Sequence, residues 1–257
     1  MKGAAMLVLT RKAGERILVG ADVEFVILGV AGGRVRIGVT APASIHVCRG
    51  ELGKPRSSPP VDRILDPFLA PNPGSRTMSR LKQLSPDEVE GKTKRLFESV
   101  SVALGTVPNM VRAMGNAPAV LEGYLALSGA LGGGGLSAKD RERIALVVAE
   151  TNGCDYCLAA HSALGRLAGL SPEELRASRG ATSSDARSAH LLRLARAVVD
   201  SRGRVSSDEL MAARDAGISD GDIAEVVANV ALNVLTNYFN NVAQTDIDFP
   251  PAEPLAA

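Results

Sequence analysis

The chain has 257 residues, 46% of them hydrophobic, which is enough for one large domain or two smaller ones with cores of their own. Three cysteines are too few for a disulfide framework, the N-terminus has no signal-peptide pattern, and no run approaches the roughly 20 apolar residues of a membrane span. We therefore expect a cytoplasmic protein without a membrane segment, in which a Cys-x-x-Cys pair is redox-active or metal-bound rather than structural.

The formal net charge is only +1, but the charges are unevenly spread. Residues 1–77 hold 11 Lys and Arg against 6 Asp and Glu, whereas residues 78–257 hold 18 against 22. This asymmetry predicts two parts with different partners, and the basic part is the candidate for binding a polyanion.

The first part of the chain is predicted to be a small all-β module. Short runs rich in Val, Ile and Leu alternate with turn residues, and Gly32-Gly33 between two such runs is a hairpin signal. The strands are expected at residues 6–10, 16–19, 23–30, 34–39 and 45–48.

Residues 53–77 hold six of the fourteen prolines and are predicted to be a linker, with at most one helical turn at 61–65. From residue 80 onward the pattern is helical, and we expect seven or eight helices and no strand. Five helix starts share one chemistry, a serine N-cap with an acidic residue three positions later, at Ser85, Ser137, Ser171, Ser206 and Ser219.

Cys154-Asp-Tyr-Cys157, followed by His161, is the most informative stretch of the chain. At roughly 100° per residue, positions 154, 157 and 161 fall within an arc of about 60° on one face of a helix. Two thiols and an imidazole should therefore point into one small volume, as a thiol–disulfide site with its own base requires.

His161 lies one helical turn beyond Cys157, so we assign Cys157 as the attacking thiol and Cys154 as its resolving partner. Gly153 breaks the preceding helix and should leave Cys154 near a helix N-terminus, where the helix dipole favours a thiolate. The helix expected at 138–151 carries Glu142 and Glu150, and either carboxylate could orient His161 or relay its proton.

These residues resemble the signature of the AhpD-like (alkyl hydroperoxidase D), carboxymuconolactone decarboxylase superfamily. Glu142, Cys154-x-x-Cys157 and His161 stand at its spacing, and the likeness covers most of residues 80–250. The resemblance implies an all-α, usually oligomeric domain. In this superfamily the second cysteine, here Cys157, reacts with peroxide or disulfide, and the first, here Cys154, then forms a disulfide with it. The glutamate and histidine relay protons, and the family's spacing selects Glu142 rather than Glu150 for the glutamate. It also implies an external dithiol reductant, such as a lipoyl group, and no bound cofactor.

One residue departs from that pattern. AhpD itself has a histidine where this chain has Tyr156, which favours the broader peroxidase-related branch over a dedicated partner of a peroxiredoxin. The decarboxylase branch lacks the cysteine pair, so lactone decarboxylation is not expected.

Alternatives from the residues themselves are a half zinc site or inert buried thiols. Five asparagines lie near the C-terminus, and we expect them to form the packed, hydrogen-bonded face of the last long helix, with contact to the active site as the alternative. These are Asn229, Asn233, Asn237, Asn240 and Asn241.

The β part resembles the carbon storage regulator (CsrA) family over residues 6–52. The Leu9-Thr10-Arg11 start and the Arg36-Ile-Gly-Val-Thr-Ala-Pro42 core both sit at the family's spacing. The family forms intertwined homodimers that bind GGA-bearing loops of mRNA and block translation. Its RNA-contacting positions correspond here to Leu9, Thr10, Arg11, Val47 and Arg49. The family's C-terminal helix is replaced here by a proline-rich stretch, and Cys48 stands where histidine is common.

We therefore expect a two-domain fusion: a CsrA-like module at 1–52, a linker at 53–77 and an AhpD-like domain at 78–257. The first hypothesis is a thiol peroxidase or disulfide reductase that forms a homo-oligomer and uses a peroxide or disulfide substrate, with a lipoyl protein or peroxiredoxin as candidate partner. The second is a translational regulator that binds mRNA through residues 6–52, with the helical domain as redox sensor or oligomerisation scaffold. The third is that the fusion is an artefact of the gene model, with the true start of the helical protein near Met78.

Overall fold

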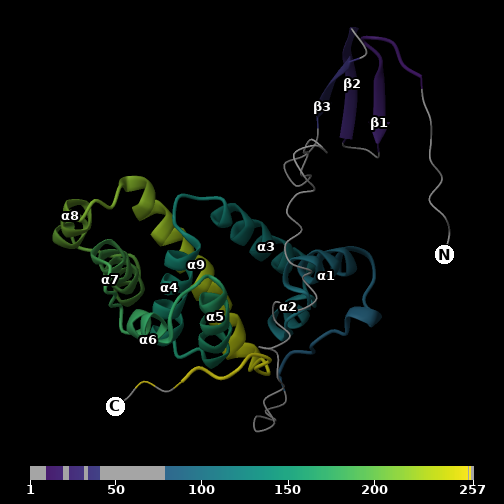
Figure 1. Ribbon diagram of the computed structural model, residues 1–257. Coiled ribbons are helices and arrows are strands. Elements are labelled where there is room, and N and C mark those ends of the chain that lie inside the picture. Colours follow the sequence, from purple (N-terminus) through teal and green to yellow (C-terminus); the bar gives the residue numbers. More distant parts are fainter. Residues whose placement is uncertain (1–9, 20–22, 32–33, 41–78, 254, 256–257) are drawn as a thin grey trace. The chain divides into compact units, whose positions relative to one another are not determined.

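The computed structural model describes residues 10–19, 23–31, 34–40, 79–253 and 255. The chain divides into two compact units, Met1–Pro60 and Val61–Ala257, which we describe separately. The first unit contains the described strands and the second the described helices (Figure 1). The expected order of an all-β module followed by an all-α domain is therefore confirmed.

The first unit holds a three-stranded antiparallel sheet in the order β1–β2–β3, made of β1 (Arg16–Val19), β2 (Val23–Ala31) and β3 (Arg34–Thr40). The register shifts between Ile27 and Gly29, where a β-bulge leaves one extra residue in β2. The strands expected at 6–10 and 45–48 lie outside the described residues, apart from Thr10, which is not in a strand. So does the linker at 53–77.

The sheet leaves much of its apolar surface in contact with solvent. Leu28, Val30 and Ile37 are 59%, 61% and 52% exposed, and among the described residues of this unit only Ile27 is a buried hydrophobic residue. A sheet of three strands needs a packed face to be stable, so this surface calls for further chain to cover it.

The second unit is a bundle of nine α-helices within residues 79–253, after a short 3-10 helix at Pro86–Glu88. Nine exceeds the seven or eight expected, because helices as short as the six-residue α2 show too little 3.6-residue periodicity to be counted from sequence. The helices are α1 (Gly91–Leu104), α2 (Asn109–Met114), α3 (Pro118–Gly132), α4 (Ala138–Thr151), α5 (Asp155–Leu167), α6 (Pro172–Arg179), α7 (Ala186–Ser201), α8 (Ser207–Asp215) and α9 (Asp220–Ala243).

Four of the five predicted serine caps are confirmed. The side chain of Ser137 accepts the Asp140 N–H at the start of α4, and Ser171, Ser206 and Ser219 each form a complete capping box. Ser85 precedes only the short 3-10 helix, and its side chain makes no cap hydrogen bond.

Helix α4 is the centre of the bundle and packs against α5, α6, α7 and α9. Its residues from Ile144 to Ala149 are at most 1% exposed, and they contribute to two hydrophobic clusters. One cluster includes both motif cysteines; the other lies against α7 and α9. Because α4 is held on several sides, side chains that project from it toward α5 are placed on a rigid element.

Candidate active site

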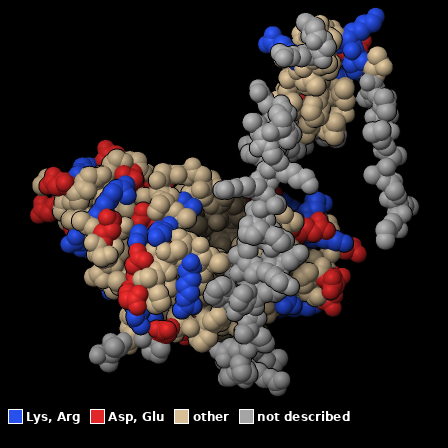
Figure 2. All heavy atoms as spheres, viewed as in Figure 1, with Lys and Arg blue, Asp and Glu red and all other residues tan. Residues whose placement is uncertain are grey.

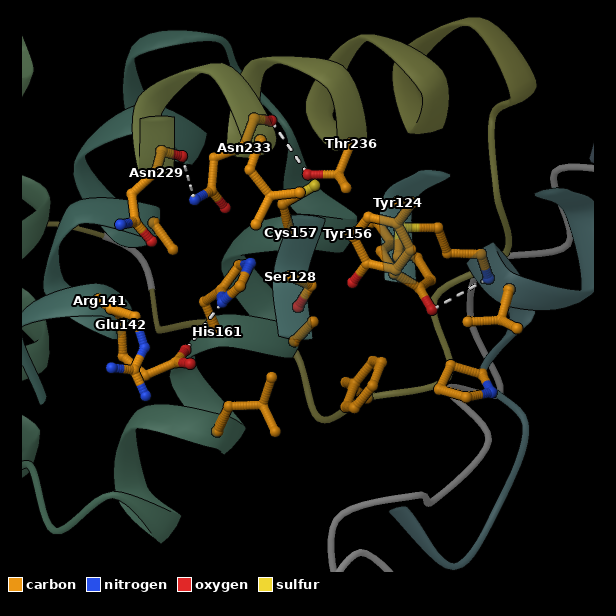
Figure 3. A pocket seen from close by; sticks show the side chains of 18 of the residues that line it. Tyr124, Ser128, Arg141, Glu142, Tyr156, Cys157, His161, Asn229, Asn233 and Thr236 are labelled. Atoms are coloured by element: carbon orange, nitrogen blue, oxygen red, sulfur yellow. Dashed lines mark hydrogen bonds and ion pairs between the residues drawn. The ribbon is translucent and has the colours of Figure 1, made fainter. Parts of the chain in front are cut away.

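A cavity of about 180 Å³ lies among α3, α4, α5 and α9. The apolar side chains that line it include Leu104, Met110, Val111, Leu131, Leu232 and Phe249. The polar side chains that line it include Ser128, Arg141, Glu142, His161, Asn229, Asn233 and Thr236. Figure 3 shows the labelled side chains of these helices gathered around the cavity, and in Figure 2 the surface between α9 and α3 is hollowed and largely uncharged.

The two motif cysteines are joined as a disulfide at the start of α5. Cys154 is the N-cap, and its Sγ accepts the Cys157 backbone N–H at 3.3 Å. Gly153 has a φ of +59°, a left-handed conformation that suits glycine and turns the chain from α4 into α5. The predicted position of Cys154 at a helix N-terminus is confirmed.

The two sulfurs differ in their access to the cavity. Cys157 lines it, whereas Cys154 is fully buried and is not part of its wall. The two thiols were expected to point into one small volume, and their sulfurs do lie together because they are bonded. Only Cys157 lines the cavity that His161 also lines, because Cys154 is the N-cap of α5. This difference makes Cys157 the sulfur that a substrate in the cavity can reach.

His161 and Glu142 form a hydrogen-bonded pair on the cavity wall. His161 Nδ1 lies 2.8 Å from Glu142 Oε2, and both side chains are about one-fifth exposed (Figure 3). A carboxylate at Nδ1 fixes the ring and leaves Nε2 as the nitrogen that can accept a proton. In this disulfide form His161 makes no hydrogen bond to either sulfur among the described residues.

Close packing of α5 helps to bring this pair together. At Gly165, one turn beyond His161, an added Cβ would lie 2.6 Å from Leu175 Cδ2 and 3.8 Å from the Cβ of Glu142. A larger residue would therefore require the Leu175 side chain to move.

Glu150, the other carboxylate considered on α4, has a different role. Its Oε2 accepts a hydrogen bond from Arg179 Nε at 2.6 Å, which ties α4 to α6. Glu142, not Glu150, is therefore the partner of His161.

Two tyrosines beside the cavity are held neutral. Burial, together with the nearby Glu142 charge, raises the pKa of Tyr124 to about 12. Burial and the charge of Asp248 raise the pKa of Tyr156 well above its ordinary value. The Tyr156 hydroxyl accepts the Met110 N–H at 3.2 Å, and its ring stands edge-on to Phe249. The residue that replaces the AhpD histidine is thus a packed structural element.

The five C-terminal asparagines were expected to form a packed helix face, with contact to the active site as the alternative. Three of them do contact the site. Asn229 and Asn233 line the cavity, and Asn240 Nδ2 lies 3.3 Å from Cys157 Sγ. Asn237 and Asn241 instead hydrogen-bond Asn152, which ends α4. The sequence allowed contact with the active site for this cluster, but it could not single out Asn240, because the contact joins residues 83 positions apart.

The structure thus brings together Cys157, Cys154, His161 and Glu142. Of the five residues expected to bind RNA, it describes only Thr10 and Arg11, whose side chains are exposed. Leu9, Val47 and Arg49 lie outside the described residues, as does Cys48.

Two family models match the chain. Residues 6–56 match the global regulator protein family, CsrA, and residues 118–200 match the carboxymuconolactone decarboxylase family. The translational regulator CsrA of Thermosipho melanesiensis is 55% identical over 47 residues, which cover 18% of this chain and 63% of that protein. For the CsrA of Leifsonia xyli the identity is 51% over 49 residues, or 19% and 58% of the two chains. The chain thus spans about three-fifths of the length of these curated relatives.

The helical unit resembles several solved structures. A peroxidase-related protein from Ralstonia eutropha, described as an alkylhydroperoxidase AhpD core, superposes with a TM-score of 0.61 and 23% identity, over 66% of this chain and 93% of that one. A peroxidase-related protein from a Silicibacter species gives a TM-score of 0.60 and 25% identity, over 69% and 94%. The debrominase Bmp8, solved with 2,3,4-tribromopyrrole, gives a TM-score of 0.55 and 17% identity, over 68% and 92%.

The chain therefore combines an N-terminal region that matches the CsrA family model with a C-terminal region that matches the carboxymuconolactone decarboxylase model and has an AhpD-like fold. Among the described residues, no helix is both long and apolar enough to cross a membrane.

Proposed function

We propose that the helical unit is a thiol-dependent peroxidase or disulfide reductase that reacts through Cys157. The observation that carries this proposal is the placement of one sulfur of a Cys-x-x-Cys disulfide on a cavity wall that also presents a His–Glu pair. A redox-active disulfide needs one sulfur that a reactant can meet and a second within bonding distance. Cys157 is only 2% exposed but lines the cavity, and Cys154 is bonded to it.

The reaction begins with the reduced protein. The Cys157 thiolate attacks one oxygen of a hydroperoxide, the O–O bond breaks, and the alkoxide leaves as an alcohol after taking up a proton. Cys157 is then a sulfenic acid. The Cys154 thiol attacks the Cys157 sulfur and displaces water, which forms the disulfide. Two electrons have passed from the two thiols to the peroxide.

The His161–Glu142 pair supplies the proton transfers. With Nδ1 engaged by Glu142, His161 Nε2 accepts the thiol proton and returns it to the departing oxygen. Glu142 acts by stabilising the imidazolium that forms in between, as a carboxylate does in other acid–base pairs.

An external dithiol closes the cycle. One of its thiolates attacks Cys157, the sulfur that lines the cavity, and forms a mixed disulfide while Cys154 leaves as a thiolate. The second thiol of the donor then attacks the mixed disulfide. This step releases the protein with both cysteines reduced and leaves the donor as a disulfide. A lipoyl group fits this role because its two thiols are close enough to form a ring disulfide. We propose a lipoyl-bearing protein or a similar dithiol as the electron donor.

The cavity favours a compact, largely apolar substrate. Its apolar lining residues and its volume of about 180 Å³ fit a small organic hydroperoxide better than a charged or extended molecule. The debrominase Bmp8, which shares the fold, was solved with a brominated pyrrole. Small aromatic halides are therefore worth including in a substrate panel.

The test is hydroperoxide consumption by the full chain with dihydrolipoamide as reductant. We expect Cys157→Ala to abolish turnover and Cys48→Ser, which changes the cysteine outside the helical unit, to leave it unchanged. Cys154→Ala should stop at the sulfenic acid, which a dimedone probe detects by mass spectrometry. Equal turnover in the parent and in Cys157→Ala would overturn the proposal.

A second function is proposed for the N-terminal unit, because its family model and its curated relatives are those of a translational regulator. We propose that residues 6–52 bind GGA-bearing mRNA through Leu9, Thr10, Arg11, Val47 and Arg49. Arginine offers planar paired donors to phosphate and base edges and stacks on unpaired bases. A second copy of the chain would cover the exposed apolar sheet.

The RNA proposal is tested with the full chain and a hairpin RNA that carries GGA in its loop. Arg49→Ala and Arg11→Ala should each weaken binding by about 10-fold or more, in line with about 1–3 kcal/mol for a base contact. A CCA loop should weaken binding in the same way. Equal affinity for the GGA and CCA loops would contradict specific recognition and would indicate binding by nonspecific charge attraction alone.

A further inference from the structure

Asn240 lies at the reactive sulfur and comes from a helix that holds none of the residues of the sequence motif. It comes from α9, is only 3% exposed, and its Nδ2 is 3.3 Å from Cys157 Sγ. Cys154 Sγ instead faces the backbone N–H of Cys157. Each sulfur of the pair therefore has a hydrogen-bond donor of its own.

The chemistry of the disulfide fixes the orientation of this amide. A disulfide sulfur carries no hydrogen, so it can only accept, and the amide must present its nitrogen to it. As a result, Asn240 Oδ1 is buried without a hydrogen-bond partner among the described residues. Leaving a buried amide oxygen unpaired costs about 1–3 kcal/mol, and such a cost is typical of a site under functional constraint.

Reduction strengthens the contact. A neutral disulfide sulfur is a weak acceptor, whereas a thiolate carries a full negative charge and accepts a hydrogen bond about twice as strongly as a neutral group. Because Asn240 is buried, its amide is a fixed donor, and such a donor is worth more there than in solution.

No positive charge on α9 performs this task instead. Residues 226–243 of the sequence contain no Lys, Arg, Asp or Glu. The titratable groups that line the same cavity come from α3, α4 and α5, and Asp248 lies behind Tyr156. They are Tyr124, Arg141, Glu142, Tyr156 and His161. The amide of Asn240 is thus the side-chain donor that the described structure places directly on Cys157.

We propose that Asn240 is a catalytic group that donates its side-chain N–H to Cys157 and favours the thiolate of the reduced protein. The inference rests on the proposed function only in taking Cys157 as the reacting thiol. It adds a fifth residue to the site, drawn from α9, and it assigns the negative charge to the sulfur that faces the cavity.

The test measures the acidity of Cys157 in the reduced full chain. In a Cys48→Ser, Cys154→Ser background, iodoacetamide alkylation followed against pH reports the Cys157 thiol alone. We expect Asn240→Ala to raise its pKa by about one pH unit, which slows alkylation near neutral pH by up to about 10-fold. Asn240→Asp, of nearly equal volume, should raise it further, because a carboxylate repels the thiolate.

Asn241→Ala is the matched control, because that neighbouring amide donates to the Asn152 carbonyl and not to sulfur. Circular dichroism melting shows whether each variant is folded, and Asn240→Asp serves if Asn240→Ala is not. A Cys157 pKa that is equal in the parent, Asn240→Ala and Asn240→Asp would overturn the inference. A shifted pKa in a protein that neither consumes peroxide nor reduces a disulfide would overturn the proposed function and leave the inference standing.

Discussion

The site depends on individual side chains whose roles separate cleanly. Glu142 and Glu150 lie on the same helix, yet Glu142 is bonded to His161 and Glu150 to Arg179. The first pair faces the cavity, whereas the second ties α4 to α6. Replacing each glutamate by glutamine therefore separates a catalytic effect from a structural one.

We expect Glu142→Gln to lower kcat/KM for hydroperoxide reduction by about 100-fold, the usual size of a general acid–base contribution. A neutral amide holds the histidine ring but does not stabilise its positive charge. Stopped-flow oxidation of the reduced protein measures the rate. Glu150→Gln is the control and should react at the parent rate; equal losses in both variants would contradict a specific role for Glu142.

Tyr156 gives a prediction on stability. Its hydroxyl is the partner of the buried Met110 N–H, so Tyr156→Phe leaves that donor unpaired. We expect the free energy of unfolding to fall by about 1–3 kcal/mol, measured by urea denaturation. An unchanged midpoint would show that the hydrogen bond contributes nothing.

At the scale of single residues, the sequence predicts contacts between residues that are close together along the chain. The spacing of Cys154, Cys157 and His161 places the thiols and the base on one helix, and Glu142 follows from a family resemblance. Asn240 is different, because its contact with Cys157 depends on how α9 crosses α5. Helical periodicity marks which faces are buried but not which helix lies opposite.

At the scale of elements, α9 performs two tasks. Its inner face supplies polar groups to the cavity, and near its start the Glu225 carboxylate accepts the N–H groups of Gly135 and Leu136 in the loop between α3 and α4. These two hydrogen bonds lower the pKa of Glu225. They join the first turns of α9 to the loop that begins after α3.

Glu225→Gln should therefore destabilise the protein in a pH-dependent way. A lowered folded-state pKa means that the stabilisation is present above the unfolded value of 4.5 and is lost as the pH falls through the folded value. We expect a loss of about 1 kcal/mol in the free energy of unfolding at pH 7, which shrinks below pH 4.5. Glu122→Gln, at an exposed pair with Lys92, should change little. A pH-independent difference for Glu225→Gln would contradict this account.

The outer face of α9 carries an apolar stripe. Val227, Leu235, Tyr238 and Val242 are 47%, 42%, 58% and 65% exposed. Their separations of eight, three and four residues place them on one face of the helix. We expect the full chain to form a homo-oligomer in which this stripe meets a second copy. Light scattering after size exclusion should show a smaller mass for Leu235→Glu; the same mass in variant and parent would contradict it.

At the scale of the whole molecule, the chain combines two units with separate chemistry. Their order, their fold classes and most helix starts follow from sequence, because capping serines and apolar periodicity act locally. The paths of the 6–10 and 45–48 segments and of the linker lie outside the described residues. The exposed face of the sheet is a second feature that the sequence alone does not predict. The apolar pattern of the strands predicts that this face is buried, but it does not identify the residues that would cover it.

Because the two units are compact and joined through a segment with six prolines, we expect their activities to be independent. Cys157→Ala should leave RNA affinity within about twofold of the parent, and Arg49→Ala should leave hydroperoxide turnover unchanged. Fluorescence anisotropy and a peroxide assay measure the two. A large change in RNA affinity upon oxidation, absent in Cys157→Ala, would instead favour a redox-sensing regulator.

The most direct test of the central claim is the product formed when the reduced full-length protein meets one equivalent of a small organic hydroperoxide. Peptide mass spectrometry should find the Cys154–Cys157 disulfide as the main product, formed with loss of one peroxide per disulfide, and Cys157→Ser should give no disulfide and leave the peroxide intact. Free thiols at both positions after exposure, or peroxide loss at the same rate in Cys157→Ser, would contradict the assignment of Cys157 as the reacting thiol.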